Sequence, residues 1–426
     1  MPGRIVVVAA AITTAVAGVG AVQLLPGAAP EARAAGLVGY ESCAALLEHY
    51  RDELGRSVTA YGPRGTASPE ALSARQSADA AAITSTAVGA GATGTNVQEQ
   101  GVDEPDLVKL RDGRLVVLNG TRLRILSAQP QPRQLGALDL GGTRDYGGEL
   151  LLVGDRALVI LPGWRHTPAP SSQTSDSAMS RLPGQPTTRV MLVDLDWNDP
   201  RLLEQATYDA RYVSARLVDG TVRLVTTTSP QLAFPEPTAR GMSQQQSLEH
   251  TRRAARSVHL ADVLPQVVRT DADGSVLDQG HAVACDDTSY APGARGAATL
   301  LVSTFRPEDG GLEATDRKAV TTDGDLVYSS SDRLYVATSR WGTFAPMAVD
   351  LRGVQPGIAQ DEVRTQLHAF DVSSATTTSY VGSGSVAGYV YGRWALSEHE
   401  GVLRVATTRQ PPWQQGDQRA TSSMVV

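Results

Sequence analysis

Four acidic side chains gather just before the first regular apolar pattern of the chain: Glu99, Asp103, Glu104 and Asp106. Calcium is a hard cation that takes oxygen ligands, so Asp103, Glu104 and Asp106 are the candidate ligands of a calcium ion. Calcium is also the only cofactor that the sequence suggests. The alternative is a solvated acidic turn in which Pro105 sets the entry to a strand, and short motifs more often prove to be such ordinary features.

Two other polar motifs have simpler explanations as turns. The run Asp271-Ala272-Asp273-Gly274 lacks the further acidic ligands of an EF-hand, so an Asp-Gly hairpin turn is expected there. The run Glu398-His399-Glu400 could supply an acid and a base, but it lies where a hairpin tip is expected. No Gly-x-Ser-x-Gly motif is present, and the five tryptophans do not repeat in phase. The sequence therefore predicts no catalytic residues and no organic cofactor.

Cys43 and Cys285 are the only cysteines, and their wide separation fits neither a metal site nor a redox CxxC pair. They could form a disulfide between an N-terminal helix and the body of the protein, or remain two buried thiols. Their even number and the expected export of the chain favour the disulfide. The closed loop would be very long, which gives a stabilisation of at most about 4–5 kcal/mol in the chain-entropy model.

Composition excludes some partners and permits a large core. The chain has 426 residues, of which 41% are hydrophobic. Its net charge is −7 and its isoelectric point is about 5.6. Nucleic-acid binding needs a concentrated basic face, so no nucleic-acid partner is expected.

The N-terminus predicts the compartment. Arg4 precedes an apolar run over residues 5–25, and Ala32-Arg33-Ala34 has the small-x-small form of a signal-peptidase site. Residues 1–34 are therefore predicted to be a signal peptide or an uncleaved N-terminal membrane anchor. Both alternatives make the protein extracytoplasmic, either secreted or anchored to the cell envelope, with membrane contact only through this segment.

Residues 35–61 are predicted to be a helical segment, and residues 62–95 a flexible linker rich in Ala, Ser, Gly and Thr. Within the first segment, a helix is expected from Ser42 to Leu54. Cys43, Leu47, Tyr50 and Leu54 share one of its faces, and Ser42 is its expected N-cap. The helix is too short to be stable alone, so it is expected to pack on the body.

From residue 96 onward the pattern is strand, turn, strand. A three-strand meander is expected over 107–126, with Asp112-Gly113 and Asn119-Gly120 at its reversals. Two insertions interrupt the pattern: a Pro- and Ser-rich loop over 167–188, expected to be disordered, and a segment over 235–268 with an expected helix at 247–263. Further hairpins are expected at 150–160, 215–225, 326–336 and 396–406. No helix alternates with the strands, so the predicted fold is an all-β propeller of antiparallel meander blades.

Several segments resemble a family of secreted bacterial and archaeal proteins whose β-propeller domain is distantly related to WD-40 repeats. The most specific are Val102-Asp103-Glu104-Pro105-Asp106 and Arg404-Val405-Ala406-Thr407-Thr408. The resemblance covers nearly all of the chain after residue 35. It implies a propeller fold and an extracytoplasmic location, but no settled biochemical activity.

The C-terminus departs from this resemblance. Family members continue beyond the Arg-Val-Ala-Thr-Thr strand, whereas residues 422–426 form an apolar run typical of the start of a strand without a hairpin partner. A propeller must close its ring to cover its edges. The propeller of residues 96–426 is therefore expected to be truncated, as an open arc of blades.

Two functions from different classes follow. The first is a binding or scaffolding module whose partner is an envelope protein or polysaccharide. The second is a hydrolase or lyase that acts on an envelope polysaccharide or peptide, with carboxylates at the propeller channel. Acidic side chains that converge from different blades with raised pKa values would favour the enzyme.

Overall fold

The computed structural model describes residues 10–11, 36–60, 62–63, 97–142, 147–165, 184–230, 232, 242–292, 296–340, 363–408 and 422–425. Most of residues 1–34 and the expected linker at 64–95 therefore lie outside the described residues. In the part that is described, no helix is long and apolar enough to cross a membrane.

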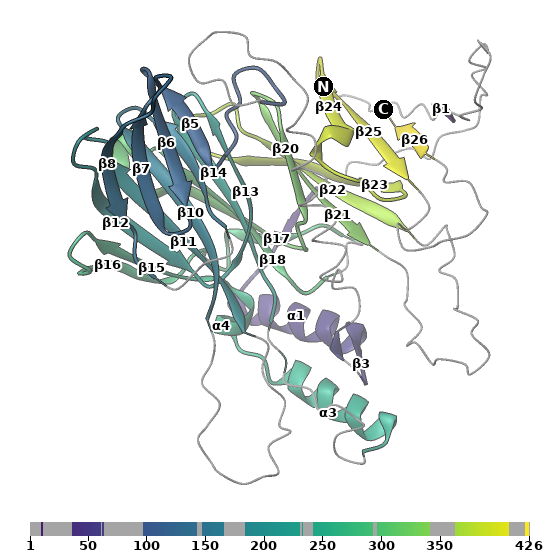
Figure 1. Ribbon diagram of the computed structural model, residues 1–426. Coiled ribbons are helices and arrows are strands. Elements are labelled where there is room, and N and C mark those ends of the chain that lie inside the picture. Colours follow the sequence, from purple (N-terminus) through teal and green to yellow (C-terminus); the bar gives the residue numbers. More distant parts are fainter. Residues whose placement is uncertain are drawn as a thin grey trace, which may run out of the picture.

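Five largely antiparallel sheets follow one another along the chain as the blades of the fold (Figure 1). The first strands of neighbouring blades lie close together around the propeller axis, since β5 contacts β9 and β13 contacts β20. The first blade consists of β5 (Val108–Arg111), β6 (Arg114–Asn119), β7 (Arg122–Ser127) and β8 (Gln134–Asp139). The predicted opening meander is thus present, followed by a fourth strand.

The next two blades each have four strands in the expected order and two more at the outer edge. The second blade runs β9 (Glu149–Val153), β10 (Arg156–Arg165), β11 (Gln185–Asp194), β12 (Arg201–Tyr208), β15 (Gln266–Asp271) and β16 (Val276–His281). The third runs β13 (Arg211–Val218), β14 (Thr221–Thr228), β18 (Thr299–Phe305), β19 (Ala314–Thr321), β17 (Thr288–Tyr290) and β2 (Val38–Gly39).

The last two blades are simpler. The fourth consists of β20 (Leu326–Ser329), β21 (Arg333–Arg340), β22 (Arg364–Asp371) and β23 (Ser379–Ala387). The fifth consists of β24 (Leu396–His399), β25 (Val402–Thr408), β26 (Ser422–Val425) and β1 (Ala10–Ala11). The expectation that the last apolar run has no partner is wrong, because β26 pairs with both β25 and β1.

Residues with positive φ angles form the tight turns that connect the inner strands to their neighbours. Asp112 and Asp219 have φ angles of 48° and 46°, and the glycines that follow them are also positive. Asp and Gly tolerate this left-handed region, which two-residue hairpins with the correct twist require. The hairpins predicted from these dipeptides are confirmed, because β5 pairs with β6 and β13 pairs with β14 on either side of the two turns.

A long insertion separates β14 from β18 in the third blade. The chain leaves β14 at Thr228, forms α3 (Gln244–Arg256) and α4 (Leu260–Val263), and adds β15 and β16 to the second blade. It then returns through β17. The single helix predicted at 247–263 is thus two helices. The predicted disordered loop at 167–188 lies partly outside the described residues, but its last residues belong to β11.

The N-terminal helix α1 (Cys43–Ser57) packs against this insertion, near α3 and α4 (Figure 1). Ser42 caps it as predicted, because its hydroxyl accepts a hydrogen bond from the backbone N–H of Ala45. Leu46, Tyr50 and Leu54 are buried on its inner face. The Tyr50 hydroxyl lies 2.6 Å from the hydroxyl of Thr299 on β18, which anchors the helix to the third blade.

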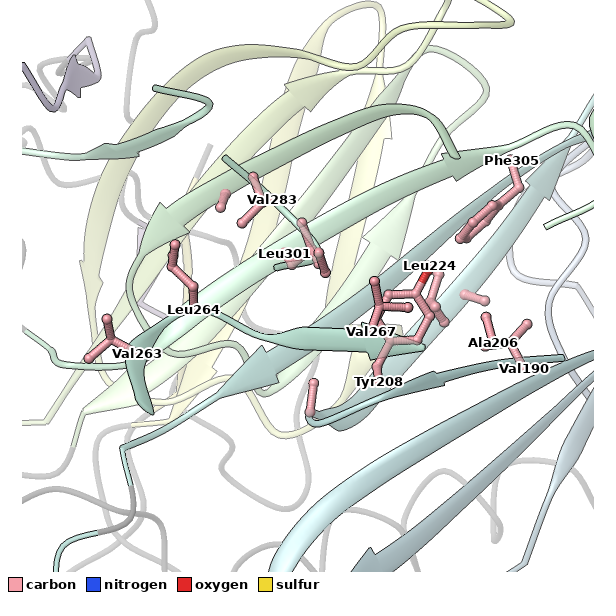
Figure 2. Close-up of a cluster of buried hydrophobic side chains, with 14 of the residues drawn as sticks. Val190, Ala206, Tyr208, Leu224, Val263, Leu264, Val267, Val283, Leu301 and Phe305 are labelled. Atoms are coloured by element: carbon pink, nitrogen blue, oxygen red, sulfur yellow. The ribbon is translucent and has the colours of Figure 1, made fainter. Parts of the chain in front are cut away.

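The largest apolar cluster lies where α1, the insertion and the second and third blades meet. Figure 2 shows part of it, in which residues from distant segments point toward one another. Its labelled members are Val190, Ala206, Tyr208, Leu224, Val263, Leu264, Val267, Val283, Leu301 and Phe305. The insertion is therefore part of the core and not a loop added to a finished propeller. Two short strands, β3 (Val58–Thr59) and β4 (Gly62–Pro63), follow α1 as a separate pair.

Candidate functional site

Residues 97–106, here called the axial segment, run along the propeller axis between the first strands of the blades. The backbone of Asp103 exchanges two hydrogen bonds with Leu217 on β13, and that of Asp106 does so with Leu150 on β9. The segment thus bridges two blades before it enters β5. The acidic motif of the sequence belongs to this segment.

Glu104 forms the buried charged centre of the axis. Its side chain is 8% exposed, and its carboxylate oxygens lie 3.5 Å from the Arg216 guanidinium on β13 and 3.1 Å from that of Arg393. Arg393 begins a short 3₁₀ helix, Arg393–Ala395, just before β24. One carboxylate therefore connects the first, third and fifth blades through two cations.

Arg216 is only 1% exposed and has further partners. It donates hydrogen bonds to the carbonyl oxygens of Ala215 and of Val327 on β20, the latter at 2.7 Å. Burial lowers its pKa, while the Glu104 carboxylate acts in the opposite direction. The ion pair with Glu104 thus stabilises the charged form of Arg216, which burial alone would destabilise.

Lys109 on β5 is also almost fully buried. Its ammonium group donates hydrogen bonds to a carboxylate oxygen of Asp103 at 2.6 Å and to the backbone carbonyl of Glu104 at 2.5 Å. Asp103 is thereby paired with a cation on the strand that follows it. The turn at 103–106 is fixed by these bonds, as well as by its two backbone bridges.

The start of the axial segment reaches the fourth and fifth blades. The Gln98 amide donates hydrogen bonds to the carbonyl oxygens of Arg393 and Leu396, at 2.9 and 2.8 Å. The Tyr328 hydroxyl on β20 donates to a carboxylate oxygen of Glu99 at 2.7 Å. The axial segment therefore contacts the inner region of the other four blades.

A second carboxylate lies beside this centre. Glu149 at the start of β9 accepts a hydrogen bond of 2.7 Å from the Tyr212 hydroxyl on β13. Burial raises the pKa of Glu149, and the nearby Asp106 raises it further, while Arg216 and Arg393 lower it. The pKa of Tyr212 is raised well above its usual value, chiefly by burial. Tyr212 therefore keeps its proton and donates it in a hydrogen bond to Glu149, which connects the second and third blades.

The structure does not bring the predicted calcium ligands together. Asp103 is paired with Lys109 and Glu104 with two arginines, while the Asp106 carboxylate accepts the backbone N–H of Leu107. Among the described residues, no group of three or more His, Cys, Asp or Glu side chains is placed to hold a metal. Calcium binding by Asp103, Glu104 and Asp106 stays a prediction, and in this structure Lys109 pairs with Asp103 while Arg216 and Arg393 pair with Glu104.

The other two polar motifs lie in turns. The Asp271 carboxylate accepts the N–H groups of Asp273 and Ser275 in the tight turn between β15 and β16, as predicted for a hairpin. His399 is exposed at the β24–β25 hairpin, and Glu398 accepts a hydrogen bond of 2.6 Å from the Ser330 hydroxyl. Neither motif belongs to the axial centre.

The two cysteines are bonded to each other. Cys43 is the first residue of α1, and Cys285 lies between β16 and β17, with Cα atoms 5.2 Å apart. The bond connects the N-terminal helix to the insertion, across 242 positions of sequence.

Strand β16 is a second candidate for function because it is an exposed edge. It is the outermost strand of the second blade, and all six of its residues are exposed. Val276 and Leu277 on β16 and Val268 on the adjacent β15 are large exposed apolar residues. Figure 1 shows both strands at the outer flank of this blade, beyond β12. An edge strand offers unpaired backbone groups to a partner strand.

Sequence reasoning found the axial carboxylates but not their partners Arg216 and Arg393, and it missed Glu149 and Tyr212. Arg216 lies at the centre of an apolar strand pattern, and a charge at such a position signals a buried ion pair. No comparable signal marks Glu149 or β16, because their roles depend on strands that are distant in sequence.

Comparison with known proteins agrees with this architecture. The family described as Beta propeller domain matches residues 92–426, which is most of the chain. The match begins just before the axial segment and includes every strand of the five blades except β1 and β2. No curated protein sequence matches the chain. Both the blades and the match show that the chain belongs to the Beta propeller domain family.

Proposed function

We propose that this protein is an extracytoplasmic binding or scaffold module that holds an extended segment of another envelope protein along β16. The observation that carries the proposal is the exposed edge of β16, with apolar side chains beside it. The location rests on the leader expected at residues 1–34 and on the resemblance to secreted propellers related to WD-40 repeats.

Strand addition suits the chemistry of this edge. An extended peptide can pair with the free backbone groups of β16, and alternate side chains can contact the exposed Val268, Val276 and Leu277. Asp278 on β16 provides a charge that can select a basic residue in the partner. Main-chain hydrogen bonds would give affinity and the side-chain contacts specificity.

The outer edges of the first and fourth blades, which have four strands each, are less suited. On β23 the large exposed apolar residue is Val381, and on β8 it is Leu135. Strand β16 is also held on the core by the insertion, since Val267 on its neighbour β15 is buried in the largest apolar cluster. A rigid, exposed and apolar edge is the combination that strand addition needs.

The first experiment compares two lysine pairs. Val276→Lys with Leu277→Lys places two charges on β16, whereas Val381→Lys with Leu135→Lys places two on the control edges. Each purified protein is immobilised and exposed to detergent-solubilised envelope proteins and, separately, to purified envelope polysaccharide. We expect the unaltered protein and the control to retain an envelope protein, and the β16 variant to lose it.

Two results would contradict the proposal. Retention of the same protein by the β16 variant would exclude this edge as the contact. If the protein retained only polysaccharide, and neither pair of lysines affected this, the partner would be a glycan and not a protein. Hydrogen exchange of the complex provides an independent measurement, because a paired β16 would show slower exchange of its backbone amides.

A second candidate function, a hydrolase or lyase, is supported by the axial centre. Glu149 and Asp106 come from different parts of the fold, and the pKa of Glu149 is raised by burial. A carboxyl group with a raised pKa can act as a general acid at a higher pH than an ordinary glutamate. Hydrolysis of envelope glycan or peptide that disappears in Glu149→Gln, while binding at β16 persists, would favour this alternative.

A further inference from the structure

The Cys43–Cys285 disulfide lies at the wall of an open cavity. A hollow of about 580 Å³ is lined by both cysteines together with residues 40–42, 260, 264, 281, 283, 284 and 286. Cys43 is exposed, whereas Cys285 is buried. A volume of this size is within the range of pockets that take small molecules or several peptide side chains.

The lining is mainly apolar. Tyr40, Leu260, Leu264 and Val283 contribute to it, and Leu264 and Val283 also belong to the apolar cluster of Figure 2. A second hollow of about 360 Å³ lies on the same segment, since His281 and residues 283–284 line both. The chain that leads into Cys285 is therefore accessible from two hollows.

The disulfide is not the only attachment of α1. The Arg51 guanidinium donates a hydrogen bond of 2.8 Å to the carbonyl of Val258, and the Tyr50 hydroxyl contacts Thr299. Leu46 and Leu54 are buried on the same face. Helix α1 can therefore remain docked when the sulfur–sulfur bond is broken, so the bond can open without unfolding of the blades.

We propose that Cys43–Cys285 is a thiol-exchange site for an oxidoreductase that presents a dithiol on an extended apolar loop. One thiolate of the reductant attacks the accessible Cys43 sulfur, and the Cys285 thiolate leaves. The second thiol of the reductant then attacks the reductant's first sulfur, which is bonded to Cys43 in the mixed disulfide, and the Cys43 thiolate leaves. The reductant departs as a disulfide, and its two protons end on Cys43 and Cys285.

The position of Cys43 favours the second step. Its thiolate is released at the first position of the 15-residue helix α1, where backbone N–H groups and the helix dipole stabilise negative charge. Glu41 and Asp286 line the same cavity and oppose this effect. Reverse exchange with an oxidised partner would close the bond after the insertion has folded.

The test measures how the native disulfide is reduced. The purified oxidised protein is treated with dithiothreitol at several concentrations, in water and in urea below the unfolding transition. Free thiols are then blocked with iodoacetamide and counted by intact mass. We expect a rate that is proportional to dithiol concentration and unaffected by urea, with an unchanged circular dichroism spectrum after reduction.

A rate that rises steeply with urea would overturn the proposal, since attack would then require unfolding. A Cys43–Cys285 disulfide that is not reduced below the unfolding transition would also overturn the proposal. Leu260→Trp fills the cavity and should slow reduction by thioredoxin several-fold, whereas Leu135→Trp on β8 should not. Equal rates for both variants would show that the reductant does not enter through the cavity.

Discussion

Replacement of Glu104 by Gln tests whether the axial ion pairs hold the blades together. The change keeps the shape of the side chain but leaves Arg216 and Arg393 without their shared counter-charge. At separations of 3.5 and 3.1 Å, each contact contributes about 5 kcal/mol at an effective dielectric constant of about 20. Desolvation of the three charges offsets much of this attraction. Removal of one partner from a buried pair costs about 3–5 kcal/mol in measured cases, and that is the expected loss here.

The assay is urea unfolding followed by circular dichroism, in which the free energy of unfolding is extrapolated to water. Asp52→Ala is the control, because it removes an exposed ion pair to Arg56 on α1 that is worth about 0.3–0.5 kcal/mol. A second variant, Glu104→Met with Arg216→Met, removes two of the three buried charges and should recover part of the loss.

If Glu104→Gln lowered the free energy of unfolding by less than about 1 kcal/mol, the reasoning would be refuted, because removal of an exposed ion pair has an effect of that size. A double variant that is less stable than Glu104→Gln would also refute it. The cost would then come from packing or hydrogen bonds and not from an uncompensated charge.

Two further changes test Glu149 beside the axis and Gly388 at the end of β23. Because burial raises the pKa of Glu149, the unfolded chain loses this proton first, and the folded state is increasingly penalised as the pH rises above about 4.3. Glu149→Gln should therefore gain stability relative to the parent as the pH rises above about 4.3, and a pH-independent difference in urea unfolding would contradict this. Gly388 has a φ of +90°, and an added Cβ would lie 2.8 Å from the carbonyl oxygen of Thr408. Gly388→Ala should lower the free energy of unfolding by more than about 1 kcal/mol. Gly384→Ala is the control and should lower it by less, because there is open space around Gly384. Equal losses of thermal stability in the two variants would disprove the strain at Gly388.

Local patterns predicted much of the fold because they depend on neighbouring residues. Asp112-Gly113 and Asp219-Gly220 adopt the positive φ angles that hairpins need, and alternation of apolar residues gave the strands. The cap at Ser42 was predicted for the same reason. Each of these features is decided within a few positions of sequence.

Contacts between distant segments could not be predicted in this way. Glu104 looks like a solvated or metal-binding carboxylate until Arg216 and Arg393 are placed beside it. Strand β16 resembles any other hairpin strand, and only the sheet order shows that it forms an edge of the second blade. The sequence shows which residues carry charge, but the topology decides whether that charge is paired.

The return of the insertion to the second blade has a consequence for synthesis on the ribosome. A regular propeller is a repeat protein whose blades can be completed one after another as the chain emerges. Here the second blade lacks its outer strands until β16 has been made, and the third lacks β18 and β19 until after that. The second blade is therefore completed only at His281 and the third only at Thr321, and an interrupted chain that ends before His281 would contain neither blade in complete form.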